Sequence, residues 1–523
     1  MEALAPLLRG NDPPTDLQAR EARRLLDAAN AELAALDDAI SKLSLVPSQL
    51  QLQRQSHTES SIALRKVLSP IRRIPCEILG EIFLCCRNNS IHAPGYLITD
   101  PRETPLLLGT ICSSWRVVSH NTPRVWDTVF LGTQPALDAA KALSMRALLE
   151  RSRRLPLTIS LVALQDPSFE RDWSATTRWA LDVVWDFHER LEHISLGVTA
   201  EGVVPRILPL EKPLPVLNSV NFIVHHRATD PLLAAYLDLF QTAPRLRVLK
   251  LEDPRHSDDI LTSRFPWSQL ISLDLDIPID VLTARDILVQ CTMLETARFL
   301  NIEGAVEDDT SVRPICTLNH LQTLNLVLGR GYRVASISDG PSADFITSFA
   351  MPKLNKLRIE LSDWSADDLL NLHARSHFTL HGLSLTGLAF PVDELLPLLQ
   401  LLTALQSLSL RLCDFIGSDL FRLFTYKPGS QAPLLLPHLR TLKLHKITDN
   451  LDGDVLVNMV DSLRNYAGDL NAPFPAIQSV EIFLEGKQLA PAIESRLATI
   501  RSSGFLIDPF HPCTGPSEGY HRC

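Results

Sequence analysis

From residue 191 onward the chain repeats one short pattern of apolar and polar positions. Each copy has the form of Leu246-x-x-Leu249-x-Leu251, with the apolar residue replaced in places by Ile, Val, Phe or Ala. The alternation at the end of each copy predicts a β-strand with one buried face. Eleven copies begin at Leu191, Leu217, Leu246, Leu270, Leu294, Leu321, Leu354, Leu380, Leu405, Leu439 and Ile477.

Stretches with helical spacing separate many of these strands. Strands that alternate with helices predict a parallel sheet that curves into an arc, with the helices on its outer side. Ten or eleven such units can together bury a continuous aliphatic core, so the sequence predicts an α/β fold. The stretches that we expect to be helical are 231–241, 280–290, 365–374, 392–402 and 455–466.

Earlier in the chain the pattern is first helical and then mixed. Leu26, Leu33 and Ile40 recur every seven residues, which predicts a helix from Asp16 to the region of Pro47. This seam either pairs two chains as a coiled coil, or belongs to one amphipathic helix or hairpin packed on its own protein. Residues 1–15 show no pattern and are expected to be loose. We also expect strands at 127–131 and 155–161 and a helix at 136–152.

Residues 71–126 combine several apolar helical stripes in a short length of chain. After Pro75, Ile78 and Ile82 share one stripe, and Leu79 and Phe83 share the stripe beside it. A second helical segment carries Leu108, Ile111, Cys112 and Trp115. Such a small unit cannot bury all of this surface internally, so either the rest of the chain or a partner must cover it.

The order of motifs in this region resembles the F-box. The motifs are Ile74-Pro75-x-Glu77-Ile78-Leu79, Ile82-Phe83, Cys112-x-x-Trp115-Arg116, Pro123 and Val125-Trp126. The spacing between the two halves departs from the family, because polar residues 85–104 lengthen the middle and are expected to form a loop. Residues 155–484 resemble irregular leucine-rich repeats, since most copies recur with a period of about 20–29 residues. A short helical stretch before the box is similar to fungal F-box proteins.

The resemblance implies a substrate receptor of a cullin-type (SCF) ubiquitin ligase. In such a receptor the box binds the Skp adaptor, and the arc presents its inner face to an unknown protein target. The alternative is an interaction scaffold whose box does not engage a ligase. The predicted adaptor-binding residues are Ile74, Pro75, Ile78, Leu79, Ile82, Phe83, Leu108, Cys112, Trp115 and Trp126. The inner-face positions between the leucines include Arg247, Lys250, Asp274, Asp276, Arg358, Glu360, Arg411 and Lys443, among which neither sign dominates.

These readings divide the chain into five segments. They are a disordered N-terminus (1–15), a helical, coiled-coil-like segment (16–68), an F-box-like domain (69–130), a leucine-rich-repeat-like domain (131–506) and a disordered tail (507–523).

The composition indicates which kinds of partner the protein binds and in which cellular compartment it lies. The net charge is −10 and no long basic run is present, which argues against nucleic-acid binding. Nine cysteines without a Cys-x-x-Cys pair predict no zinc knuckle and favour a reducing, intracellular compartment, cytoplasmic or nuclear. The sequence shows neither a secretory signal nor an apolar run long enough for a membrane span.

Three patterns could suggest an enzyme, and the sequence argues against each. Gly515-x-Ser517-x-Gly519 matches a nucleophile elbow, yet prolines precede it where a strand is required. His188 and His193 are one residue too far apart for a zinc-protease helix. His373, His377 and His381 are spaced by four residues, but His381 begins a repeat strand. We therefore expect no catalysis and no cofactor. The alternative is a hydrolase or a metal-dependent enzyme, which would require Ser517, or His373, His377 and His381, to lie in a formed pocket.

Overall fold

The computed structural model describes most of the chain, and every statement below refers to the described residues. They divide between two compact units, Met1–Leu196 and Gly197–Cys523. The described ranges are 4–9, 13–42, 48–86, 104–132, 139–162, 182–198, 212–224, 237–253, 260–303, 314–328, 345–346, 348–360, 366–388, 391–413, 416–425, 435–445, 452–467, 477–483, 491–502 and 506–509.

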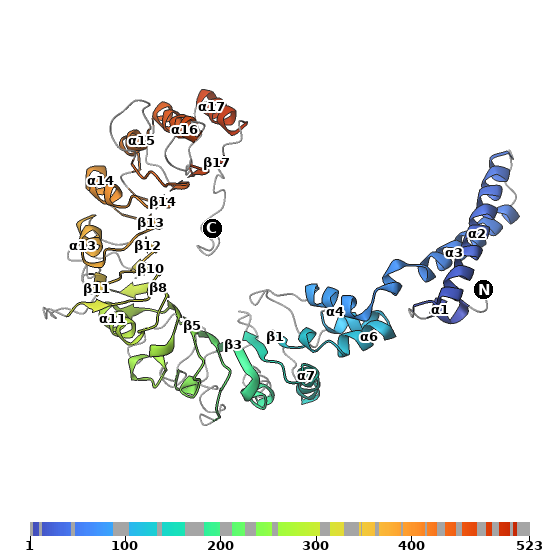
Figure 1. Cartoon of the computed structure of the whole chain (residues 1–523). Helices are drawn as coiled ribbons and strands as arrows, with labels where there is room; N and C mark the ends of the chain where they lie inside the picture. The colour runs from blue at the N-terminus through green and yellow to red at the C-terminus, as the bar shows by residue number, and fades with distance from the viewer. Residues whose placement is uncertain are drawn as a thin grey trace. The chain divides into compact units, whose positions relative to one another are not determined.

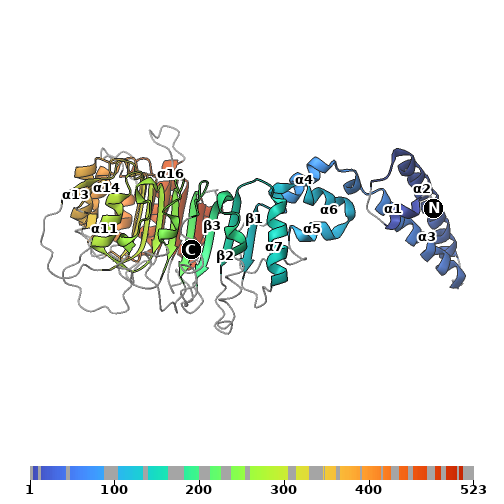
Figure 2. The ribbon, with the colours of Figure 1, turned by 90° about the horizontal axis from the view of Figure 1, so that it is seen from below.

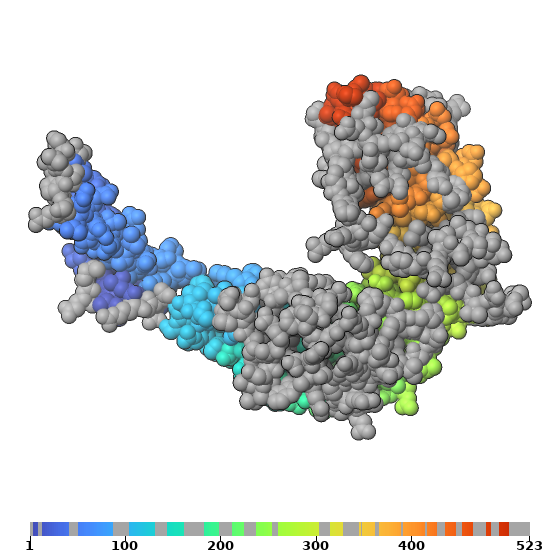
Figure 3. Space-filling view, turned by 180° about the vertical axis from the view of Figure 1, so that it is seen from behind, coloured from blue at the N-terminus to red at the C-terminus, as the bar shows by residue number. Residues whose placement is uncertain are grey.

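The first unit opens with a hairpin of two long helices, α2 (Asp16–Lys42) and α3 (Ser48–Val67), which pack along each other. The predicted seam residues Leu26, Leu33 and Ile40 are partly buried, and Leu26 packs against the cluster that α1, α2 and α3 share, so the seam is used within the chain. Of the two alternatives left open by the sequence, the structure has the hairpin. In the space-filling view its described residues form a narrow rod of blue atoms (Figure 3).

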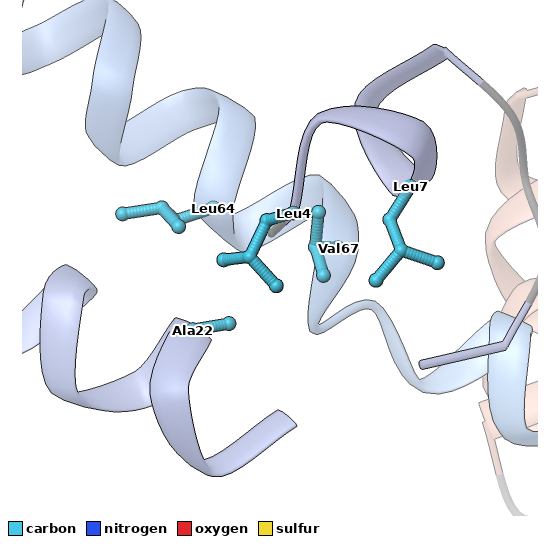
Figure 4. Packing of buried hydrophobic residues seen from close by; sticks show 5 residues of the cluster. All are labelled: Leu4, Leu7, Ala22, Leu64 and Val67. Carbon is cyan, nitrogen blue, oxygen red and sulfur yellow. The ribbon is translucent and has the colours of Figure 1, made fainter. Parts of the chain in front are cut away.

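The prediction that residues 1–15 are loose is wrong for residues 4–9. Helix α1 (Ala5–Arg9) packs across the open end of the hairpin. Leu4 and Leu7 contact a cluster formed with Ala22 of α2 and with Leu64 and Val67 of α3 (Figure 4). The local sequence gives no such signal, because five residues form a stable helix only through tertiary contact.

Three short helices follow the hairpin, in the region whose motifs suggested an F-box. They are α4 (Cys76–Cys85), α5 (Leu106–Ile111) and α6 (Ser113–His120), which group together in Figure 2. Two 3₁₀ turns flank them, η2 (Pro70–Arg73) and η3 (Pro123–Val125). Most of the predicted loop, residues 87–103, lies outside the described residues. Arg72 of η2 donates a hydrogen bond to the Leu7 carbonyl over 3.0 Å, which ties this region to α1.

The first unit ends with a short parallel sheet, as the sequence predicts. Its strands pair in the order β1, β2, β3, with neighbouring strands parallel. The strands are β1 (Thr128–Gly132), β2 (Leu157–Val162) and β3 (Leu191–Val198), with helix α7 (Ala139–Arg151) after β1 and the 3₁₀ turn η5 (His188–Arg190) before β3.

The second unit continues the same plan of parallel strands. The strands pair in chain order, with β7 joined only to β8. They are β4 (Ser219–Val224), β5 (Val248–Glu252), β6 (Ser272–Asp276), β7 (Ile279–Asp280), β8 (Thr296–Glu303), β10 (Thr323–Leu328), β12 (Lys356–Glu360), β13 (Gly382–Thr386), β14 (Ser407–Arg411), β15 (Thr441–His445), β16 (Ser479–Phe483) and β17 (Leu506–Pro509).

Leucines of successive copies lie directly opposite one another, which explains why the repeat is regular. Leu357 pairs with Leu383, which pairs with Leu408, and this pairs with Leu442. All four are buried beneath the helices, while the residues between them face the other side of the sheet. Each strand therefore completes the core of the strand before it.

Helices cover one side of this sheet, the outer side of its curve (Figure 1). Two very short strands, β9 (Cys316–Thr317) and β11 (Phe349–Ala350), pair separately from the main sheet. The helices are α11 (Val281–Gln290), α13 (Ala366–Ser376), α14 (Val392–Leu401), α15 (Ser418–Phe424), α16 (Gly453–Ala467) and α17 (Pro491–Ser502).

The α/β class, the parallel sheet and all eleven predicted repeat strands are confirmed. Four of the five helices predicted between the copies are also present. The fifth stretch, 231–241, lies largely outside the described residues, and its described end contains the 3₁₀ turn η6 (Asp238–Phe240). The prediction of disorder from residue 507 is wrong for residues 507–509, because β17 pairs with β16 at Ile507, Asp508 and Pro509. Among the helices in the described ranges, none combines the length and apolar character needed to cross a bilayer.

Candidate docking face on helices α4 to α6

Helix α4 presents two apolar stripes in opposite environments. Pro75 occupies the N-cap position and the helix begins at Cys76. Leu79 and Phe83 are buried, with 4% and 0% of their surface exposed. Ile78 and Ile82, each one position earlier, are 54% and 38% exposed. One stripe therefore forms the interior of the region, and the other is left facing outward.

Helices α5 and α6 show the same division. Leu108 and Val118 are buried, whereas Leu107 and Ile111 of α5 and Val117 of α6 are exposed. Six of the fifteen large hydrophobic side chains that are exposed in the described residues come from the stretch that begins with η2 and ends with α6. We call these six the exposed apolar set: Ile71, Ile78, Ile82, Leu107, Ile111 and Val117.

An aromatic contact holds α4 against α6 behind the exposed set. The rings of Phe83 and Trp115 lie 5.1 Å apart in a tilted arrangement. The Trp115 backbone N–H donates to the sulfur of Cys112, the N-cap residue of α6, over 3.3 Å. A Cβ at Gly80 would lie 3.2 Å from Thr122 Oγ1, so α4 approaches the chain beyond α6 closely. The exposed side chains thus rest on a packed interior.

Trp126 joins the helical region to α7. Its indole Nε1 donates to the Ser119 carbonyl over 2.8 Å, and the guanidinium of Arg151 lies 4.7 Å from the ring centroid. The ring of His120 packs edge-on against it. Burial, together with the nearby Arg151 and Arg116 guanidinium groups, lowers the pKa of His120 below its usual value. Trp126 is therefore an interior residue with a satisfied N–H.

The predicted adaptor-binding residues consequently separate by burial. Pro75, Ile78 and Ile82 are exposed, and Ile74, Cys112 and Trp115 are partly exposed. The side chains of four predicted contact residues are too buried to meet a partner on this surface; they are Leu79, Phe83, Leu108 and Trp126. The sequence could not show this division, because helical spacing identifies two neighbouring stripes without showing which one faces inward.

Four members of the exposed apolar set are absent from the predicted adaptor-binding residues. Leu107 and Ile111 are four residues apart on α5, a spacing that could have indicated a shared face. Val117 carries no comparable signal, because it lies between the partly exposed Trp115 and the buried Val118. Ile71 precedes the helices in η2, where helical spacing says nothing about exposure.

A second surface of interest is the inner face of the second unit, opposite its helices. On strands β12 to β15, in the described repeats, every inner position is polar or glycine. Four of these twelve positions carry a cation and one carries a carboxylate, which gives this stretch a net charge of +3. The twelve are Lys356, Arg358, Glu360, Gly382, Ser384, Thr386, Ser407, Ser409, Arg411, Thr441, Lys443 and His445.

Strands β4 to β6 carry the opposite balance on the same face. Lys250 is the one cation there, against the three carboxylates of Glu252, Asp274 and Asp276. Asp274 receives a hydrogen bond from Arg298 of β8 over 3.0 Å. Strand register therefore separates charges that looked mixed in the sequence, with an acidic stretch at one end of the unit and a basic stretch toward the other.

His445 shows the electrostatic character of the basic stretch. Desolvation, followed by the charge of Arg411 on the neighbouring strand, lowers its pKa below the usual value, and Lys443 adds to this effect. Glu481 of β16 acts in the opposite direction and forms an ion pair with Lys443 over 2.7 Å. The neutral imidazole is thus favoured between the cationic side chains.

The histidines that could have suggested a metal enzyme lie on separate elements. His373 lies on α13, His377 follows that helix with a positive φ of 51°, and His381 precedes β13. His188 lies in η5 and His193 on β3. Ser517 lies outside the described residues. Within the described ranges, no three His, Cys, Asp or Glu side chains gather closely enough to hold a metal ion. The seven cysteines described are all free thiols.

The chain matches no protein-family model, and no curated protein matches it.

Proposed function

We propose that the protein is a substrate-recognition subunit of an SCF-type ubiquitin ligase. In this proposal the exposed apolar set docks on the Skp adaptor, and a protein target binds the inner face of the repeat unit. The observation that carries the proposal is the exposure of Ile78 and Ile82 on a helix that Phe83 packs against Trp115 of α6. The order of motifs that resembles an F-box supports the same assignment.

Docking would remove several branched apolar side chains from water. Complete burial of one such side chain stabilises a complex by about 1.5–3 kcal/mol. A few anchors of this kind, surrounded by polar groups, commonly dominate the free energy of binding. Glu77 and Glu81 are exposed on the same helix and would form part of that polar rim. The packed interior keeps the anchors in place before the partner arrives.

The protein would act by holding two partners close together. A target bound to the inner face would be presented at high local concentration to a conjugating enzyme carried elsewhere on the complex. The reacting groups would belong to that enzyme. A receptor of this kind needs no catalytic groups of its own, and the sequence contains no convincing motif for a nucleophile, an acid–base pair or a cofactor.

The test is a pull-down of purified Skp adaptor with the full chain. We expect the Ile78→Asp/Ile82→Asp variant to lose capture, because charged groups cannot enter an apolar interface, while its circular dichroism spectrum stays unchanged. The matched control is Leu17→Asp/Leu401→Asp, which alters two exposed leucines on α2 and α14. Capture by both variants, or by neither variant nor the wild type, would contradict the proposal.

A scaffold without ligase activity is the second candidate. It would bind its target through the same inner face, yet its exposed apolar set would meet a different partner or none. Absence of adaptor capture together with retained target binding would favour it.

A further inference from the structure

We infer that the inner face over strands β13 and β14 is a binding trough for an extended acidic peptide of the target. This deepens the proposed function, since it names the chemistry of the segment that the inner face would bind. It holds equally for a scaffold, because it requires no adaptor.

Small side chains form the floor of this trough. Five of the six inner positions on β13 and β14 are glycine, serine or threonine. Gly382, Ser384, Ser407 and Ser409 are partly exposed and make up the floor, while Thr386 is buried at its end. A floor of this kind lets a peptide backbone approach the sheet closely. Serine hydroxyl groups can both donate to and accept from a backbone, so they suit a peptide main chain without selecting its side chains.

Cations form the two walls. Lys356 and Arg358 stand on β12, on one side of the floor, and Lys443 stands on β15, on the other side. The stem of Lys356 lies beside Gly382, since a Cβ at that glycine would be 3.3 Å from Lys356 Cγ. Three strand spacings of about 4.8 Å separate the walls by about 14 Å. One extended chain with carboxylates on both of its edges fits this width.

Arg411 closes the carboxyl end of the floor on β14. It lies directly opposite His445 on the next strand. Two carboxylates partly balance the walls, because Glu360 bonds to Arg358 over 3.1 Å and Glu481 pairs with Lys443. Even when Glu481 is counted, cations exceed carboxylates by two in a chain whose total charge is −10.

The occupant follows from this chemistry. The twelve inner positions of β12 to β15 include no apolar side chain, so the trough offers no pocket for the apolar face of a helix. The excess of cations selects carboxylates, and the polar floor selects an exposed backbone. An extended segment rich in Asp and Glu satisfies both conditions.

The experiment uses the full chain and a library of fluorescein-labelled peptides of about ten residues, long enough to span a strand. Alternate positions are fixed as Asp or Glu and the others are varied among Gly, Ser and Ala. Fluorescence anisotropy should show binding that weakens as salt screens the charges. The same library with Asn and Gln at the fixed positions should not bind.

Three variants then locate the site. Arg411→Gln/Lys443→Gln should weaken binding by roughly tenfold, about twice the free energy of one exposed ion pair. The matched control Arg422→Gln/Arg496→Gln removes the same charge from helices α15 and α17, where both side chains are exposed, and should leave affinity unchanged. Ser409→Tyr fills the floor without changing charge and should abolish binding, while tyrosine suits an exposed strand position.

Three results would overturn the inference. They are equal binding of the acidic and amide libraries, equal weakening by the trough variants and the helix controls, and binding only after the serines of the peptide are phosphorylated. Adaptor capture, measured on the same preparations, distinguishes the two proposals. Its loss would concern α4 to α6 alone, and loss of peptide binding would concern β12 to β15 alone.

Discussion

At the scale of single residues, adjacent positions on α4 differ in their exposure to solvent. Leu79 and Phe83 stabilise the interior, whereas Ile78 and Ile82 are available to a partner. Substitutions in the two groups should therefore separate folding from docking. The sequence identified all four residues but could not separate them, because the direction of burial depends on α6 and η3, which pack against α4 only in the folded chain.

Trp126 should influence stability and leave docking unaffected. Trp126→Phe removes the indole donor to the Ser119 carbonyl, which keeps the backbone N–H of Thr122 as a donor over 3.2 Å, and it also reduces the volume of a buried ring. We expect the free energy of unfolding of this region to fall by about 1–2 kcal/mol. Urea titration followed by far-UV circular dichroism measures the change. An unchanged midpoint, or loss of adaptor capture by the folded variant, would disprove this role for Trp126.

His445 should make the second unit less stable in acid. Its pKa in the folded chain is lowered from 6.5, so below that pH the unfolded chain binds the proton more readily. This contribution is absent well above pH 6.5 and grows as pH falls toward the folded-state pKa. The melting temperature of His445→Gln should therefore decrease less than that of the wild type between pH 7.5 and 5.5. Parallel decreases in the two proteins would contradict the assignment.

At the scale of elements, the hairpin shows what a periodic pattern can and cannot predict. Leucines at seven-residue spacing correctly predicted α2, but the same spacing fits a partner helix from any chain. Residues Asp37 and Arg54, which bond over 2.6 Å, place that partner on α3 of the same chain. Helix α1 was not predicted, because Leu4 and Leu7 stabilise it only through contact with Leu64 and Val67, which lie far away in the sequence.

Leu64 should hold the end of the hairpin together. Leu64→Ala leaves a cavity beneath Leu4 and Leu7 and should cost about 2–5 kcal/mol of local stability. Hydrogen exchange is expected to rise in α1 and in the last turns of α3 and to stay unchanged in β12 to β15. The exposed Leu52→Ala is the matched control, since its side chain is 66% exposed. Equal exchange in both variants would show that the cluster does not stabilise the hairpin.

At the scale of the whole molecule, the repeat in the sequence predicted the architecture. The properties of the inner face depend on how the strands pair, and the sequence does not show this pairing. Eleven copies of one leucine pattern were sufficient to predict a parallel sheet with helices on its outer side. The segregation of charge along its inner face could not be read from the sequence, because Arg358, Arg411 and Lys443 lie far apart in the chain. The short strands β9, β11 and β17 contain too few residues to show alternation.

Strand β17 should protect the edge of the second unit. A chain that ends at residue 505 lacks β17 and leaves the backbone groups of β16 unpaired, beside Val480 and Ile482. Unpaired strand edges favour association with other chains. Light scattering should show aggregation of this truncation, whereas a chain ending at residue 509 should resemble the wild type. Equal behaviour of the two would show that β17 is dispensable.

The strand order of the second unit has a consequence for synthesis. From β4 onward, each main strand pairs with the one made just before it, apart from the small detours of β7, β9 and β11. Contacts of this nearest-neighbour kind need only short loops to close. As the chain leaves the ribosome, the strand with which each new repeat pairs has already been synthesised and can already be folded. The sheet can thus grow in one direction during translation, without waiting for the C-terminus.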